Sequence, residues 1–182
     1  IGTLELRNRM VVTGMGVSLA EPDGVCGQRI RAYHAAQARG GAGLVITGAA
    51  GVSWPVGGVQ YNQIAVSDDR YLPGMTALAD AVHAHGAKLA FQLHNGGPVA
   101  LLDMLAGRPV WVPSVPEPSE SDLFDSFLPE EFASSAHSQI TSIDFREIPV
   151  VEIERTVRDF AAAADRVKRS GADGIEIHGG HG

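Results

Sequence analysis

One pattern recurs along this chain and restricts its fold more than any other feature. A Gly-Ala pair is followed by a short apolar segment that ends at a polar residue or a glycine, and the three units begin at Gly41, Gly86 and Gly171. Each unit follows a stretch in which apolar residues repeat at helical spacing, so the leading glycine is placed as a helix C-cap. An earlier apolar strand covers residues 9–13. The sequence therefore predicts the order β-α-β-α-β-α-β.

The helical spacing before the third unit is typical of an amphipathic helix. Its apolar positions are Ile153, Val157, Phe160, Ala161, Ala164 and Val167. Basic residues gather near the end of this stretch, at Arg166, Lys168 and Arg169. Cations there stabilise the negative end of a helix dipole, which supports a helix that ends just before Gly171.

Strands that alternate with helices in this way form a parallel sheet. Two architectures fit, a (β/α)8 barrel and a doubly wound sheet, and both place functional residues at the C-terminal ends of the strands. The predicted strand ends are Gly14-Met15-Gly16, Thr47-Gly48, Gln92-Leu93-His94 and His178. We expect these four ends to meet at one rim of the sheet. Glycine at the strand ends leaves room there for a flat ligand.

A segment from about residue 98 to residue 147 interrupts the alternation. Prolines recur in it, and from Glu117 to Glu131 it holds six acidic residues and no basic one. A long excursion beside the strand ends fits either a lid or binding loop or a surface excursion without a role in binding.

Composition limits the class of protein. A chain of 182 residues is expected to form one domain with a real core. The net charge of −7 argues against a nucleic-acid surface, and no apolar stretch approaches the length of a membrane span. The single cysteine, Cys26, excludes an internal disulfide or a cysteine-ligated cluster within this span and favours a reducing, cytoplasmic compartment.

The last nine residues, from Gly174 to Gly182, hold two histidines in a glycine-rich turn. His178 and His181 stand three positions apart, so both imidazoles can point at one small polar atom. That atom can be a carbonyl oxygen about to gain negative charge, or a metal ion. Glu176 lies on the same strand face as His178, and a carboxylate inside a barrel needs a partner, which we expect to be a basic residue beyond residue 182, in the second half of the barrel.

Taken together, these segments resemble the old yellow enzyme family of FMN-dependent oxidoreductases, and most closely the branch that includes bacterial 2,4-dienoyl-CoA reductases. The resemblance covers nearly the whole chain. It is carried by Leu6-Arg7-Asn8-Arg9-Met10 with Gly14-Met15, by residues 38–46, by residues 81–83 with Gln92-Leu93-His94, and by residues 174–178 with His181. It implies a (β/α)8 TIM barrel of which residues 1–182 form the N-terminal half, with only the first four β/α units.

The resemblance also implies a cofactor site and a reaction. The backbone of the segment after the first strand would lie against the flavin, the residue after the second would contact the ring, and a glutamine ending the third would bind its pyrimidine edge. These positions are Thr13, Gly14, Met15 and Gly16, then Gly48, then Gln92. The pair His178 and His181 would bind the carbonyl oxygen of an α,β-unsaturated substrate, whose C=C bond is reduced with NADH or NADPH as the electron donor.

Two positions depart from the family pattern. Glycine occupies position 16, where many members carry threonine or cysteine, and Gly97 stands where an arginine often follows Gly96. A complete barrel needs about 250 residues. The family's tyrosine proton donor would fall one residue past Gly182, and its phosphate site would lie in the second half of the barrel. We therefore expect these residues by themselves to bind FMN weakly or not at all. Some relatives add a C-terminal module with a 4Fe-4S cluster and FAD, which would also lie outside this span.

Two other classes of function remain open. A metal-dependent barrel hydrolase or lyase would use His178 and His181 as ligands, with His94 as the nearest candidate for a third. A non-catalytic half barrel would instead close its open sheet edges against a second copy, as a homo-oligomer, or against a partner chain.

Overall fold

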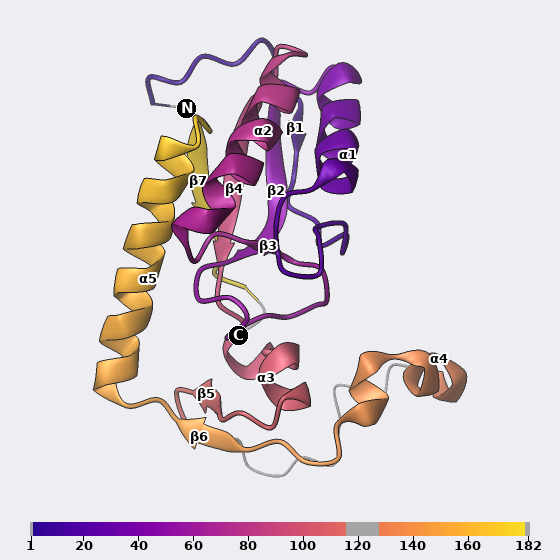
Figure 1. The fold of residues 1–182 in the computed structure, drawn as a ribbon, viewed down its shortest axis with the longest axis vertical. Helices are drawn as coiled ribbons and strands as arrows, with labels where there is room; N and C mark the ends of the chain where they lie inside the picture. Colours follow the sequence, from indigo (N-terminus) through magenta and orange to yellow (C-terminus); the bar gives the residue numbers. More distant parts are fainter. Residues whose placement is uncertain (1, 116–127, 181–182) are drawn as a thin grey trace.

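The computed structural model describes residues 2–115 and 128–180, and its centre is a parallel sheet (Figure 1). The sheet order is β1 (Val11–Val12), β2 (Leu44–Gly51), β4 (Lys88–His94) and β7 (Gly174–Ile177), and the short strand β3 (Ile64–Ala65) pairs with the end of β2. The connecting helices are α1 (Gln28–Arg39), α2 (Leu72–His83) and α5 (Val150–Arg169), with a 3-10 turn η1 (Asp69–Tyr71) before α2. The predicted parallel α/β order is confirmed, whereas β3 was not anticipated.

The glycines that open the three repeated units have the backbone conformation that the sequence predicted. Gly41, Gly86 and Gly171 have φ angles of 110°, 73° and 86°, and each lies just after the end of a helix. A residue with a Cβ is strained at such angles, so glycine lets the chain leave the helix and turn directly into the next strand.

Two faces of the sheet carry different side chains, as the alternation along a strand requires. On the face covered by the helices, strand residues such as Leu89, Phe91 and Leu93 belong to the main core. On the opposite face a smaller cluster holds Leu44, Ile46 and Ala90. Helices α1, α2 and α5 lie in one layer over the first face, so the second face is the inner surface of a partial barrel (Figure 1).

Arg7 links three segments at the N-terminal ends of the strands. Its guanidinium donates hydrogen bonds to the carbonyl oxygens of Ala38 (2.7 Å), Ala42 (2.8 Å) and His85 (2.6 Å). The last carbonyls of a helix have no partner within the helix, and a cation there also stabilises the helix dipole. One side chain thereby ties the start of the chain to the C-terminal ends of α1 and α2.

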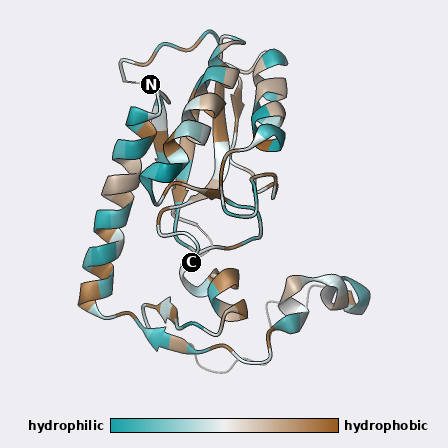
Figure 2. Cartoon of the chain, in the orientation of Figure 1, coloured by the Kyte–Doolittle hydropathy of each residue, from teal (hydrophilic) through white to brown (hydrophobic). Residues whose placement is uncertain are grey.

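Helix α5 packs over its C-terminal half only. Ala163 and Val167 are buried, whereas Ile153 and Val157 remain 45% and 64% exposed. Figure 2 shows apolar residues at the lower, N-terminal end of this helix. The amphipathic pattern thus predicted the helix correctly, but half of its apolar stripe has no partner within the described residues. Ile177, on the edge strand β7, is likewise 66% exposed.

The described parts of the interval 98–147, residues 98–115 and 128–147, lie beyond the C-terminal ends of the strands (Figure 1). Its elements are η2 (Gly97–Val99), α3 (Leu101–Leu105), β5 (Val110–Val112), α4 (Pro129–Ser134), η4 (Ala136–Gln139) and β6 (Phe145–Glu147). Strands β5 and β6 pair in parallel as a separate sheet. The buried Asp103 carboxylate anchors α3, because it accepts hydrogen bonds from the Gly57 backbone N–H at 2.7 Å and from Arg108 Nε at 2.5 Å. Most of the acidic residues between Glu117 and Glu131 lie outside the described residues.

No helix in the described parts of the chain has both the length and the apolar character needed to cross a membrane.

Candidate functional site

The site begins where the segment after β1 crosses β2. A Cβ added to Gly48 would lie 2.2 Å from the carbonyl oxygen of Met15 and 2.9 Å from the backbone nitrogen of Gly16. Both are backbone atoms, so only glycine lets the two segments come this close. The predicted flavin-binding positions Met15, Gly16 and Gly48 are therefore in contact, and they form a surface made of backbone.

Strand β2 does not end at Thr47-Gly48, as the sequence predicted, but continues to Gly51. The glycine interrupts the pairing without ending the strand, because the register between β2 and β4 shifts between Ile46 and Ala49. Thr47 and Gly48 together stand opposite the single residue Phe91, which is the geometry of a β-bulge. Glycine here permits a close crossing within the strand and does not mark its end.

At the bulge the Thr47 side chain replaces a backbone partner in the ladder. Its Oγ1 accepts a hydrogen bond from the backbone N–H of Gln92 at 3.2 Å and donates one to the Gly48 carbonyl oxygen at 2.9 Å. The bulge therefore sets the position of Gln92, which the family resemblance predicts to bind the pyrimidine edge of a flavin.

The side chain of Gln92 is enclosed on two sides. Its Nε2 donates a hydrogen bond to Glu176 Oε1 at 2.6 Å, and a Cβ on Gly14 would lie only 2.5 Å from the same nitrogen. Gln92 and Glu176 stand opposite each other in the β4–β7 ladder, and Gln92 is 8% exposed. Among the described residues the partner of Glu176 is thus the Gln92 amide. A basic partner in the second half of the barrel stays a prediction.

His178 continues the line of β7 beyond its last paired residue. Its backbone N–H donates to the Leu93 carbonyl oxygen at 3.0 Å, and its ring lies 4.9 Å from the ring of the buried His94, centroid to centroid. His181, the second predicted substrate-binding histidine, lies outside the described residues. Within the described ranges, no group of three or more His, Cys, Asp or Glu side chains is placed to hold a metal ion.

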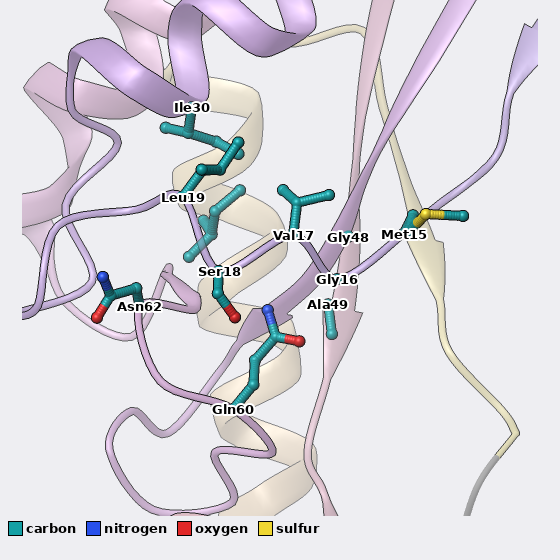
Figure 3. A pocket seen from close by; sticks show the side chains of 11 residues that line it. Met15, Gly16, Val17, Ser18, Leu19, Ile30, Gly48, Ala49, Gln60 and Asn62 are labelled. Atoms are coloured by element: carbon teal, nitrogen blue, oxygen red, sulfur yellow. The ribbon is translucent and has the colours of Figure 1, made fainter. Parts of the chain in front are cut away.

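Gln60 occupies the space that the missing side chain at position 16 leaves. A Cβ on Gly16 would lie 2.3 Å from Gln60 Oε1. Figure 3 shows this amide turned toward Gly16 at the edge of a small cavity between the segment after β1 and the loop that follows β2, whereas the Met15 side chain points away. The cavity volume is about 10 Å³, which is room for about one water molecule. Sequence reasoning missed Gln60, since no local pattern links it to Gly16.

These features suit a flat, polar ring. The backbone of Met15 and Gly16 lies against Gly48 of β2, with the Gln60 amide on one side of Gly16. Gln92 adds an amide that can both donate and accept hydrogen bonds. The residues present therefore fit the isoalloxazine ring of a flavin.

Comparison with known proteins supports the same conclusion. The family model described as NADH:flavin oxidoreductase / NADH oxidase family matches residues 1–182. The chain belongs to this family. The predicted resemblance to old yellow enzymes is thereby confirmed, and so is the partial TIM barrel.

Individual relatives give the scale of the likeness. The chain is 37% identical to an NADH oxidase of Thermoanaerobacter brockii over 182 residues, which is 100% of this chain and 25% of that relative. It is 38% identical to a metal reductase of Desulforamulus reducens over 177 residues, covering 97% of this chain and 23% of the relative. The solved old yellow enzyme from a Pichia species superposes with a TM-score of 0.79 at 26% identity, covering 100% of this chain and 45% of that structure. The chain thus spans between about a quarter and about half of the proteins it matches.

Proposed function

We propose that the protein containing this chain is an FMN-dependent oxidoreductase that reduces the C=C bond of an α,β-unsaturated carbonyl compound with NADH or NADPH as electron donor. The observation that carries the proposal is the enclosed amide of Gln92 beside the backbone surface formed by Gly14, Met15, Gly16 and Gly48. In a chain of this family, that combination supports a flavin site at the C-terminal ends of the strands.

In this proposal the residues of this chain bind the flavin and orient its ring. Thr13 to Gly16 and Gly48 would hold the ring through backbone atoms, and Gln92 would bind its pyrimidine edge. When bound, the flavin supplies the hydride chemistry, while the protein supplies position and electrostatics. The proposal extends to the C-terminal half of the barrel for the phosphate site, and to a further C-terminal module with a 4Fe-4S cluster and FAD, since the chain covers only 25% of the NADH oxidase.

Toward the substrate, His178 and His181 would donate hydrogen bonds to the carbonyl oxygen. Negative charge develops on that oxygen as hydride reaches the β-carbon, and fixed donors stabilise it more in the transition state than in the ground state. The ring of His178 lies beside that of His94, which limits where the imidazole can turn. We further propose that the enzyme is cytoplasmic, on the grounds of the single cysteine, and that it acts on a small-molecule substrate.

The test uses the full-length protein. We expect it to purify yellow, to release FMN on denaturation, and to reduce a simple enone. Replacing both His178 and His181 by Ala should leave the flavin bound and slow enone reduction by about 100-fold or more, the usual cost of losing donors to an oxyanion. His85→Ala is the matched control, because that histidine lies at the opposite end of the strands and only its backbone oxygen contacts Arg7. Full activity in the double variant, or a wild type that carries no flavin, would contradict the proposal.

A further inference from the structure

The polar groups of Gln92 are held in an asymmetric way. Its backbone N–H is fixed by Thr47 Oγ1 at 3.2 Å, and its side-chain nitrogen donates to Glu176 Oε1 at 2.6 Å. The carboxamide oxygen is on the other branch of the same planar group, so it lies away from Glu176 and remains an acceptor. The orientation of the amide is therefore determined by what Glu176 can accept.

A carboxylate enforces this orientation strongly. An ionised Glu176 has acceptors but no donor, so the reversed amide would bring two oxygens together at the 2.6 Å that now separates the nitrogen and oxygen. Hydrogen bonds to an ionised acceptor are also about twice as strong as those between neutral groups. Register contributes as well, because Gln92 and Glu176 are paired across β4 and β7 and their side chains leave the sheet on the same face.

We propose that Glu176 is a positioning residue that holds the Gln92 amide with its nitrogen toward β7 and its oxygen toward the cofactor. This inference rests on the proposed flavin site. The pyrimidine edge of a flavin carries one N–H donor, N3–H, between two carbonyl acceptors. An amide free to turn could present either end to N3, whereas the fixed amide presents an acceptor to that N–H. Glu176 acts through Gln92 and does not itself need to touch the cofactor.

A second effect of the same residue has to be separated in the test. The negative charge of Glu176 also disfavours deprotonation of a nearby N3–H, so Glu176→Gln would lower the pKa of N3–H by charge alone. A double-mutant cycle with Gln92→Leu distinguishes the two routes, because an effect that passes through Gln92 disappears once Gln92 is gone. A pure charge effect persists in both backgrounds.

The experiment compares full-length wild type, Glu176→Gln, Gln92→Leu and the double variant, with Glu147→Gln on the exposed strand β6 as the matched control. Two quantities are measured for each. One is the dissociation constant of FMN from the apoprotein, followed by flavin fluorescence. The other is the pKa of N3–H of the bound flavin, followed by absorbance against pH. Should Gln92→Leu fail to fold, as judged by circular dichroism, Gln92→Met takes its place in the cycle.

We expect Glu176→Gln to weaken FMN binding about tenfold, the cost of one misdirected hydrogen bond, and to lower the pKa of N3–H. The loss of FMN affinity should fall to less than about twofold in the Gln92→Leu background. The shift in the pKa of N3–H should shrink there to the part that charge alone causes, and Glu147→Gln should change neither quantity. Equal effects of Glu176→Gln in both backgrounds would overturn the inference and leave the flavin site intact. A wild-type protein that binds no FMN would overturn the proposed function itself, and the inference with it.

Discussion

The crossing of Met15 over Gly48 makes a quantitative prediction for the variant Gly48→Ala. The added Cβ would lie 2.2 Å from the Met15 carbonyl oxygen, 2.6 Å from its carbonyl carbon and 2.9 Å from the Gly16 nitrogen. Ordinary van der Waals contact begins near 3.4 Å, so the Met15 carbonyl must move by 3.4 − 2.2 = 1.2 Å. A backbone atom cannot escape by changing rotamer, so the whole segment after β1 has to shift.

The expected cost follows from two opposing terms. Overpacking costs about 1–3 kcal/mol, and a forced backbone shift belongs at the upper end of that range. Replacing glycine by alanine within a strand recovers about 0.5–1 kcal/mol of chain entropy. We therefore expect a net loss of about 2 kcal/mol. That loss lowers the melting temperature by about 4–8 °C in a domain of 150–250 residues, and by less in a complete barrel, because the entropy of unfolding grows with chain length.

Gly174→Ala is the matched control for this prediction. Gly174 is also a strand glycine, but among the described residues a Cβ there would meet only the Cβ of Ala90 at 3.9 Å, an ordinary contact. Thermal unfolding of the full-length apoproteins, followed by circular dichroism, should place Gly174→Ala at or above the wild type and Gly48→Ala well below it. If Gly48→Ala were as stable as Gly174→Ala, the close crossing at the bulge would not exist in solution.

Three further predictions concern other parts of the chain. Gly16→Ala should cost less than about 1 kcal/mol in the same melting assay, because its Cβ would meet the far end of the flexible Gln60 side chain and not backbone. Partial burial raises the pKa of Asp173, but hydrogen bonds from Lys88 and neighbouring groups lower it overall. A carboxyl with a lowered pKa stabilises the fold above its unfolded pKa, and this stabilisation is lost as the pH falls through its folded pKa. Asp173→Asn should therefore lower the melting temperature more at pH 7 than at pH 3. Burial raises the pKa of the Cys26 thiol to about 12. Iodoacetamide at pH 8 should therefore label Cys26 only after denaturant is added, as measured by mass spectrometry. Rapid labelling of the folded protein would show instead that this thiol is accessible.

Local patterns predicted the parts of this fold that local chemistry controls. The positive φ of Gly41, Gly86 and Gly171 follows from a helix that must end and turn into a strand within a few residues. The strands around Leu44 and Leu89 follow from apolar runs that parallel sheets bury on both faces. The glycines at positions 14 and 48 were expected to leave room for a flat ligand at strand ends, whereas the structure shows that Gly48 lies within β2 and permits a close approach of the Met15 backbone.

Contacts between distant segments could not be predicted in this way. The bulge at Thr47-Gly48 depends on the register between β2 and β4, and no residue of β2 specifies that register by itself. The hydrogen bond between Gln92 and Glu176 likewise depends on the register that places the two residues opposite each other on β4 and β7. Gln60 fills the space beside Gly16 from 44 positions away (60 − 16), and only the three-dimensional path of its loop brings it there.

The charged contacts at the base of the sheet have a consequence for how this protein can be altered. Arg7, and the Asp173 carboxylate with its partners Lys88 and His83, lie at the N-terminal ends of the strands. Strand β4 runs from Lys88 to His94, six steps of about 3.3 Å, so these charges are about 20 Å from the rim. That distance exceeds two Debye lengths at physiological salt, about 16 Å. Substitution of the exposed charges at one end of the sheet should therefore change thermal stability while it alters the electrostatic potential at the other end only slightly.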